Sequence, residues 1–267
     1  MADPILSIIG NATIMTFTHA ITRRPGKDMA SGITTSMLGP ADYVKALDQF
    51  DAYVDALNGC GLSVTVLDPL EGYPDCHFVE DAAVVTPDIA VITNPGAASR
   101  KGEVPSIAAA LQHFRKTVWV QPPGTLDGGD VLMVGRHFFI GLSDRTNQQG
   151  ARQLGEAVTG FGCTWTPVPV AAGLHFKSSV NAVSEDTLLL TREFADHPAL
   201  AGFHRIVISP QEAYAGNTLL VNGRLIMPAG FPKTRQQLQA LDRPIVELDV
   251  SEFRKMDGGL TCLSLRF

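Results

Sequence analysis

Cys262 lies at the junction between a glycine-rich turn and a short apolar run near the end of the sequence. Gly258 and Gly259 precede it, and the alternating pattern over 260–267 predicts a strand. Paired glycines let the backbone adopt a left-handed conformation or approach another segment closely. A nucleophilic thiol needs such open presentation, although a single cysteine in an apolar strand is more often a buried core residue. Cys262 is therefore a candidate nucleophile whose assignment depends on its surroundings.

The other residues capable of chemistry fall in two classes of loop. Loops that lead into a new pair of expected strands contain Asp75, Glu80, Asp81, Asp127, His175 and the segment 257–262. Loops that follow the strand pairs contain Arg100 and Arg145. Each residue alone is more often a packed, solvated or turn-capping residue. Their repeated placement in equivalent loops indicates one site with a thiol, a proton shuttle and a cation-binding group.

The chemistry of this set favours a cationic substrate. Carboxylates beside a thiol raise the thiol pKa by charge repulsion, which is unfavourable for attack on a neutral carbonyl. A guanidinium group, by contrast, donates planar N–H groups to carboxylates and would itself favour the thiolate of Cys262. Arg100 and Arg145 would suit the α-carboxylate of an amino acid. The residues thus predict an arginine-like substrate attacked at its guanidinium carbon.

The elements that must position these residues recur as one unit, a strand pair followed by a helix and a further strand. The unit recurs five times at intervals of roughly 40–55 residues, a period typical of radial and solenoid repeats. The first unit shows only one strand of its pair, over 13–21, and the C-terminal strand is its natural partner. A closed ring of five units is the economical interpretation, and an ordinary α/β sheet with inserted hairpins is the alternative.

Hydrophobic periodicity and turn signals give the expected boundaries of these elements. Helices are predicted over 42–57, 103–114, 148–158, near 195–201 and over 233–241. Strands are predicted over 62–67, 82–85, 90–93, 118–121, 131–134, 137–142, 163–170, 206–209, 218–221 and 225–228, over 245–248, and in a hairpin around Glu185-Asp186. The loop 25–36 contains Gly26 and Gly32 as hinges, and we expect it to close over the site as a mobile lid.

Composition limits the classes of function. The chain has 267 residues, 45% of them hydrophobic and 18% charged, with a net charge of −6. These values suit one globular enzyme domain over 1–267, and the lack of a basic run argues against a nucleic-acid partner. No stretch approaches the roughly 18 apolar residues of a membrane span, and no signal peptide is recognisable. Four cysteines lack zinc or disulfide spacing, which favours a reducing compartment such as the cytoplasm.

Several segments resemble the dimethylarginine dimethylaminohydrolase family, and the resemblance covers nearly the whole sequence. The segments are Phe78-Val79-Glu80-Asp81, Thr125–Asp130, Arg145-Thr146-Asn147, Gly173–Lys177, Met227–Gly230 and Asp257–Cys262. This family is one of the guanidine-modifying enzymes, together with arginine deiminase and the amidinotransferases. The resemblance implies their fold, a five-bladed α/β propeller of pseudo-fivefold symmetry in which the C-terminal strand completes the first blade.

The resemblance also implies a role for each candidate. Cys262 matches the nucleophile, His175 the general acid and base, and Asp127 the third catalytic residue, a position held by Asp or Glu in the family. Asp81, with Glu80 beside it, matches the group that binds the guanidinium. Asp75 and the Ile33 backbone match the α-amino site, and Arg100 and Arg145 match the α-carboxylate site. Phe78 matches the aromatic residue packed on the substrate methylenes, and Met256 matches a position whose backbone contacts the substrate.

Three positions depart from the family pattern. Ile33 and Phe176 stand where Leu is familiar, and His77 stands where a small apolar residue is expected. His77 would either tighten the pocket or bind an adventitious metal ion. These departures bear on the fine substrate preference and not on the reaction.

The predicted reaction is hydrolysis of Nω-methylated or Nω,Nω-dimethylated arginine to citrulline and methylamine or dimethylamine, through a covalent thiouronium on Cys262. No metal or organic cofactor is expected, the partner is the small-molecule substrate, and a homodimer is one possible assembly. The alternatives are deiminase-like activity on free arginine, a non-catalytic arginine-binding protein of the same fold, and an amidino transferase. Intact Cys262, His175 and Asp127 argue against a non-catalytic protein.

Overall fold

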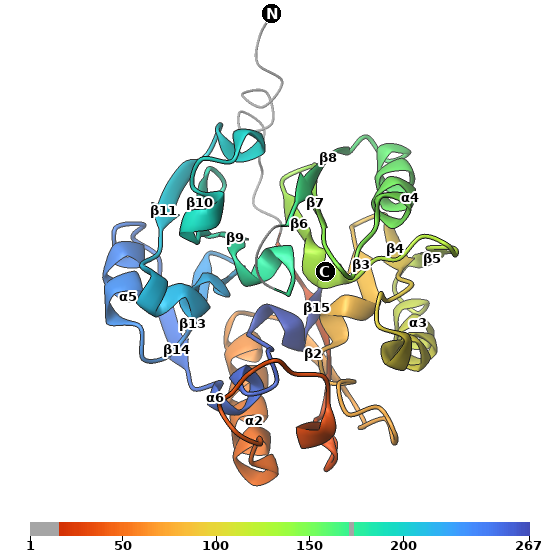
Figure 1. Ribbon diagram of the computed structural model, residues 1–267, viewed down its shortest axis with the longest axis horizontal. Helices are drawn as coiled ribbons and strands as arrows, with labels where there is room; N and C mark the ends of the chain where they lie inside the picture. The colour runs from red at the N-terminus through yellow and green to blue at the C-terminus, as the bar shows by residue number, and fades with distance from the viewer. Residues whose placement is uncertain (1–15, 171–173) are drawn as a thin grey trace, which may run out of the picture.

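In the computed structural model, the described residues 16–170 and 174–267 form five separate sheets of three strands each (Figure 1). Neighbouring strands, in sheet order, are β15 (Leu265–Arg266), β1 (His19–Arg23) and β2 (Ser63–Leu67); β3 (Ala83–Val85), β4 (Ile89–Ile92) and β5 (Lys116–Trp119); β6 (Val131–Val134), β7 (His137–Leu142) and β8 (Thr164–Pro169); β9 (Val180–Ala182), β10 (Thr187–Leu190) and β11 (His204–Val207); and β12 (Leu219–Val221), β13 (Arg224–Pro228) and β14 (Ile245–Leu248).

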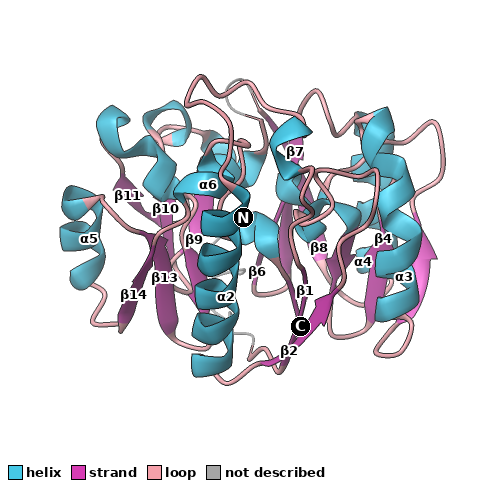
Figure 2. Ribbon diagram, turned by 90° about the horizontal axis from the view of Figure 1, so that it is seen from below, coloured by secondary structure: helices cyan, strands magenta, loops and turns pink. Residues whose placement is uncertain are grey.

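Every sheet has the same internal topology. Its first strand pairs antiparallel with the second, and the second pairs parallel with the third. A parallel pair needs a crossover connection, and helices provide it in four of the five units. The crossover helices are α2 (Tyr43–Gly59), α3 (Val104–Leu111), α4 (Gln148–Thr159) and α5 (Pro232–Gln239), and α6 (Ser251–Arg254) follows β14. Figure 2 shows the helices beside the sheets. The α/β class and the repeated unit are therefore confirmed.

Local sequence explains where two of these helices begin. Asp42 precedes α2 and its side chain accepts a hydrogen bond from the Lys45 N–H at 3.0 Å. Asn147 precedes α4 and accepts from the Gly150 N–H at 2.8 Å. Each side chain satisfies a backbone donor that has no partner within the helix. Both helices then bury one apolar face, which in α4 includes Leu154 and Val158.

The first strands of the sheets are almost entirely buried and contact one another. β15 contacts β3, β6 contacts β9, and β9 contacts β12. Figure 1 shows β3, β6, β9 and β15 near the centre of the view. The hydrophobic core is divided into clusters between the sheets and helices rather than forming one continuous mass. The loops that carry the candidate residues extend from the ends of these central strands.

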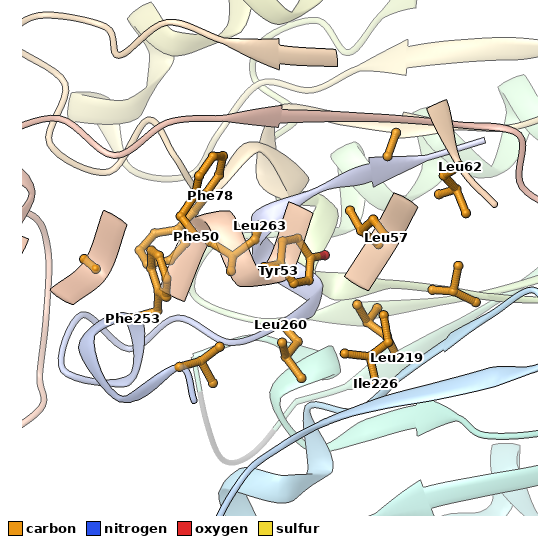
Figure 3. Packing of buried hydrophobic residues seen from close by; sticks show 14 of the residues in the cluster. Phe50, Tyr53, Leu57, Leu62, Phe78, Leu219, Ile226, Phe253, Leu260 and Leu263 are labelled. Atoms are coloured by element: carbon orange, nitrogen blue, oxygen red, sulfur yellow. The ribbon is translucent and has the colours of Figure 1, made fainter. Parts of the chain in front are cut away.

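One core cluster holds the C-terminal segment that carries Cys262 (Figure 3). Phe50, Tyr53 and Leu57 of α2 pack there with Phe253, Leu260 and Leu263. Burial of a side chain of this size stabilises the fold by about 1.5–3 kcal/mol. The Tyr53 hydroxyl lies 2.6 Å from the Ser264 hydroxyl, so its polar end is satisfied in the core. The nucleophile candidate is therefore attached to a well-packed support.

The predicted pairing of the C-terminal strand with the first unit is confirmed, because Ala20 pairs with Arg266 and Ile21 with Leu265. The strand predicted over 260–267 is too long, since Thr261–Leu263 forms a 3-10 turn and only Leu265–Arg266 is extended. The turn directs both Leu260 and Leu263 into the core, which strict alternation could not do.

The helix predicted near 195–201 is also wrong. That region contains two 3-10 turns, Arg192–Phe194 and Pro198–Leu200. Pro198 has no N–H to continue a helix and disfavours the helical conformation at His197. The first strand begins at His19 rather than at residue 13, and residues 13–15 of that prediction lie outside the described part of the chain. Within the described ranges, no helix is long and apolar enough to cross a membrane.

Candidate active site

A pocket of about 30 Å³ brings together nine of the eleven residues predicted from the sequence for the site. They are Ile33, Asp75, Phe78, Asp81, Arg100, Arg145, His175, Met256 and Cys262, and the pocket is completed by Leu174, Asp257 and Gly258. Asp127 lies directly behind His175, while Glu80 faces a different cavity. Segments far apart in the sequence thus converge on one small pocket.

Cys262 lies in the 3-10 turn Thr261–Leu263, and its thiol is half-buried at the pocket. Neither Gly258 nor Gly259 has a positive φ, whereas Asp257 has a φ of 57°. A Cβ atom on Gly258 would overlap the ring of Phe78, and one on Gly259 would lie 2.5 Å from the Asn217 amide. The two glycines are therefore needed for close approach and not for a left-handed backbone.

Two residues that sequence reasoning missed hold this turn from the side. The buried Asn217 accepts a hydrogen bond from the Thr261 N–H at 2.9 Å, and its amide donates to the Thr261 hydroxyl at 3.0 Å. The Tyr214 hydroxyl donates to the Gly258 carbonyl at 2.9 Å. Both come from the 3-10 segment Pro210–Gly216 or its C-cap. Nothing in an isolated Asn or Tyr in the sequence signals such a contact.

His175 is buried against two carboxylates. Its Nε2 atom lies 3.0 Å from Oδ2 of Asp127 and 3.9 Å from Oδ1 of Asp81. Backbone N–H groups fix both acids, since Gly96 donates to Asp127 and Gly129 to Asp81, each at 2.9 Å. Burial by itself would lower the pKa of His175, but Asp81 and the hydrogen bond with Asp127 raise it to about 9. The imidazole is therefore protonated near neutral pH and can act as an acid.

Burial, Glu80 and Asp81 together raise the pKa of the Cys262 thiol to about 12. The free site therefore holds a neutral thiol. A substrate cation about 4 Å away would favour the thiolate by roughly 4 kcal/mol at an effective dielectric constant of 20, or about three pKa units. The acidic surroundings that disfavour the thiolate alone thus suit a cationic substrate that restores it.

The two arginines differ in how far they are already occupied. Arg100 is buried, and its guanidinium contacts Asp81, Glu103 and the carbonyl oxygen of Phe78. The bonds to Glu103 and Phe78 measure 2.7 and 2.8 Å. The Arg145 side chain makes no hydrogen bond or ion pair with any other described residue, and it lines the pocket. Arg145 thus has its full set of donors free for an anion, and Arg100 has few left.

The loop 25–36 is docked over the pocket. The Ile33 N–H donates to both carboxylate oxygens of Asp75, at 3.1 Å each. The Thr34 hydroxyl donates to the Lys255 carbonyl at 2.8 Å, and the Thr35 hydroxyl donates to Asp257 at 2.9 Å. Burial raises the pKa of Asp75 despite these contacts and its cationic neighbours. The structure shows the closed arrangement, and the mobility of the loop stays a prediction.

Gly32 allows this closed arrangement, because a Cβ atom there would overlap the Asp75 carboxylate. We expect Gly32→Ala to raise KM by about tenfold or more, since it weakens a hydrogen bond to a charged group. In the Gly32→Ala variant, citrulline should protect the amides of residues 25–36 from hydrogen exchange less than it does in the parent protein. Gly59→Ala is the matched control, because a Cβ atom on Gly59 meets nothing within 4 Å. Equal kinetics for the two variants would contradict the lid.

The positions that depart from the family pattern lie in or behind the pocket wall. Ile33 is in the lid, with its side chain partly exposed. His77 is fully buried beside the rings of Phe78 and Phe253. Burial lowers the pKa of His77 to about 3, and the positive charge of Arg100 contributes to the shift. Phe176 lies in the core, packed edge-on against Phe194 and outside the pocket lining. His77 is therefore not in the pocket lining, and it contacts the pocket wall at the ring of Phe78.

Three side chains have the spacing of metal ligands. Asp81, Asp127 and His175 offer ligand atoms that all lie within 4.8 Å of one another. A metal ion there would have to displace the proton from His175, whose pKa is raised by the same two carboxylates. A guanidinium needs no such displacement, because its N–H groups donate to carboxylates while His175 keeps its proton. The set therefore suits an organic cation better than a divalent metal.

Comparison with known proteins decides the family. The family model for "N,N dimethylarginine dimethylhydrolase, eukaryotic" matches residues 41–263. A dimethylarginine dimethylaminohydrolase of Pseudomonas aeruginosa is 43% identical over 253 residues, which cover 94% of this chain and all of that protein. The chain belongs to the dimethylarginine dimethylaminohydrolase family. A family member from Streptomyces coelicolor is 41% identical, over 92% of this chain and 96% of its own.

Solved structures agree with this assignment. A mutant of the P. aeruginosa dimethylarginine dimethylaminohydrolase in complex with citrulline superposes with a TM-score of 0.93 at 42% identity, covering 95% of this chain and all of that one. The N-terminal domain of ArgZ, an arginine dihydrolase from cyanobacteria, has a TM-score of 0.84 at 18% identity and covers 93% of this chain and 97% of its own. The second likeness concerns the fold alone.

Proposed function

We propose that this chain hydrolyses Nω-methylated and Nω,Nω-dimethylated L-arginine to citrulline and the corresponding amine. The observation that carries the proposal is the pocket itself, where one thiol, a protonated histidine and buried carboxylates line a space that the loop 25–36 contacts. Only a cation relieves the charge repulsion at Cys262, and only a group with several N–H donors satisfies the acids around it. Membership of the dimethylarginine dimethylaminohydrolase family points to the same substrate class.

In the proposed first step, the bound substrate cation drives the Cys262 thiol to release its proton to solvent, and the resulting thiolate attacks the guanidinium carbon. A carbon–sulfur bond forms and the bond to the methylated nitrogen breaks. His175 donates its proton to the departing amine, and Asp127 orients the imidazole and stabilises its charged form. Asp81 accepts hydrogen bonds from the guanidinium N–H groups and holds the trigonal carbon against the thiol. The product is a thiouronium bonded to Cys262.

Water then attacks the thiouronium carbon. His175, now neutral, accepts a proton from that water, the carbon–sulfur bond breaks, and the Cys262 thiol is regenerated with citrulline. No metal or organic cofactor enters either step. Closure of the loop 25–36 limits access of bulk water during the first step, which strengthens the contacts of Asp81 in a lower dielectric.

The amino-acid end of the substrate is assigned to the other side of the pocket. We place its α-amino group at Asp75 and the Ile33 backbone, its methylenes against Phe78, and a further backbone contact at Met256. Arg145 binds the α-carboxylate. Arg100 was predicted for the same role, and we assign it a smaller share through the few donors that Asp81, Glu103 and the Phe78 carbonyl leave free. Glu80 supports the guanidinium site through its charge beside Cys262.

Arg145→Ala is expected to raise KM for methylarginine by about tenfold or more, because it removes a charge-assisted contact worth about 1.5–3 kcal/mol. Turnover of methylguanidine, which has no carboxylate, should hardly change. Arg136→Ala is a matched control on the surface hairpin, away from the pocket lining. Equal losses of Arg145→Ala on both substrates would show that Arg145 supports the fold and not the ligand.

The direct test of the proposed activity is incubation with each methylarginine and with arginine, followed by measurement of citrulline. Citrulline from methylarginines with little from arginine is the expected result. Preferential turnover of arginine would favour a deiminase, and amidino transfer to a second amine would favour a transferase. Tight binding of methylarginine with no product would favour a non-catalytic role.

We also propose that the five sheets form a five-bladed α/β propeller and a single domain over 1–267. The contacts between the buried first strands of neighbouring sheets support this arrangement. A homodimer and a cytoplasmic location complete the proposal, and the four free thiols suit a reducing compartment. Light scattering of the purified protein tests the dimer, and cell fractionation tests the location.

A further inference from the structure

A second and larger cavity lies on the other side of Glu80 from the active-site pocket. Its volume is about 190 Å³, below the roughly 300–1,000 Å³ typical of sites for drug-sized ligands. The two cavities share no lining residue, although their linings alternate along the chain at Glu80 and Asp81 and at Thr261 and Cys262. One layer of chain therefore separates them.

The lining of this second cavity is amphipathic. Apolar side chains from the buried first strands form one part, including Val84, Leu132 and Leu219. Polar and charged groups form the other part, and they include Lys177 and Arg266. Such a lining fits a small molecule with an apolar body and one charged end.

The charged groups that line the cavity leave an excess of positive charge. Oε1 of Glu80 accepts from Lys177 Nζ at 2.7 Å and from Arg266 Nη2 at 3.4 Å, so two cations share one carboxylate. Lys177 makes no other side-chain hydrogen bond within the described residues, which leaves two ammonium donors free. The other acid in the lining, Glu185, is paired with Arg243 at 2.9 Å. Among the described residues that line the cavity, one positive charge therefore remains without a counter-charge.

We propose that the second cavity is a binding site for a small organic carboxylate. Its carboxylate accepts hydrogen bonds from Lys177 and from the free donors of Arg266, and its apolar body lies along the buried first strands. The Lys177 and Arg266 side chains are only 12% and 14% exposed, so an ion pair there is shielded from bulk water. This site is distinct from the carboxylate site at Arg145.

The position of the site also couples it to the active-site pocket. Glu80 accepts hydrogen bonds from Lys177 and Arg266, the two residues proposed to bind the anion, and its negative charge also acts on Cys262. A second negative charge behind Glu80 disfavours the thiolate further. If the proposed hydrolase activity is correct, occupancy of the second cavity lowers kcat without competing with methylarginine. The binding itself does not depend on that activity.

Hexanoate titrated into the Cys262→Ser protein by calorimetry tests the site independently of turnover. We expect saturable binding of one equivalent that persists when citrulline is present. Hexan-1-ol, which lacks the charge, should bind about tenfold more weakly or worse, and hexylamine should not bind. Loss of hexanoate binding on addition of citrulline would show that the anion enters the active-site pocket instead.

Lys177→Met keeps the aliphatic stem and removes the charge, and we expect it to weaken hexanoate binding about tenfold or more. Lys116→Met, the same change on the exposed strand β5, is the matched control. Ala182→Leu fills the cavity without altering its charge, and it should also abolish binding. This variant keeps the test decisive if Lys177→Met does not fold. Unchanged affinity in either cavity variant, or equal affinity for hexan-1-ol, would overturn the proposal.

Discussion

Replacement of Cys262 by serine is expected to lower kcat by roughly 10⁴-fold or more, a loss comparable to removal of a catalytic nucleophile in other enzymes. A serine hydroxyl is nearly isosteric, but among buried carboxylates it has no base that makes it a competent nucleophile. The fold should persist, because the turn around Cys262 is held by Asn217 and by its apolar neighbours rather than by the thiol. Citrulline formation and thermal unfolding measure the two effects separately.

Cys163→Ser is the control for this experiment, since Cys163 is a buried free thiol outside the pocket lining. It should keep its activity and lose some stability. In the parent protein, acid quench during turnover should trap the intermediate, with its added mass on the peptide that contains Cys262. Added mass on the peptide of Cys76 or Cys163 would disprove the assignment of the nucleophile.

The repeated unit could be predicted from the sequence because its signals are local. Alternation, turn residues and helical spacing each act over a few residues, and the hairpin at Asn222-Gly223 illustrates how strongly they specify a turn. The role of the C-terminal strand could be predicted as well, since the first unit lacked a partner strand. The short length of that strand could not, because the 3-10 turn at Cys262 depends on core contacts of Leu260 and Leu263 with α2.

The candidate site was predictable as a set of residue types and through family resemblance, but its internal contacts were not. Arg100 and Arg145 look equivalent in the sequence. Only the structure shows that Arg100 is paired with Asp81 and Glu103, whereas the Arg145 guanidinium pairs with no carboxylate among the described residues. Glu80 and Asp81 are adjacent, yet their side chains line different cavities. Asn217 gave no signal at all. Such differences arise from tertiary packing, which residue type and spacing do not encode.

Asp127→Asn is expected to lower kcat by about 10²- to 10⁴-fold, the range that a general acid and base contributes. The amide keeps the size of the carboxylate but removes its charge and alters its hydrogen bond to His175 Nε2. Asp127 is one of the groups that raise the pKa of His175, so its loss lowers that pKa. A smaller fraction of His175 is then protonated near neutral pH, and less acid is available for the departing amine.

The pH profile distinguishes this role from a merely structural one. In the substrate complex of the parent protein, where the bound cation favours the Cys262 thiolate, kcat should fall at alkaline pH as His175 loses its proton. In Asp127→Asn this alkaline fall should move to lower pH. The free energy of unfolding of the parent protein should also fall at alkaline pH. The raised pKa of His175 stabilises the fold fully below pH 6.5, and this contribution disappears as pH rises through about 9. Asp127→Glu restores the charge and should recover part of the activity and the alkaline limb. An alkaline limb that stays at the parent position in Asp127→Asn would exclude Asp127 as the group that sets the protonation of His175.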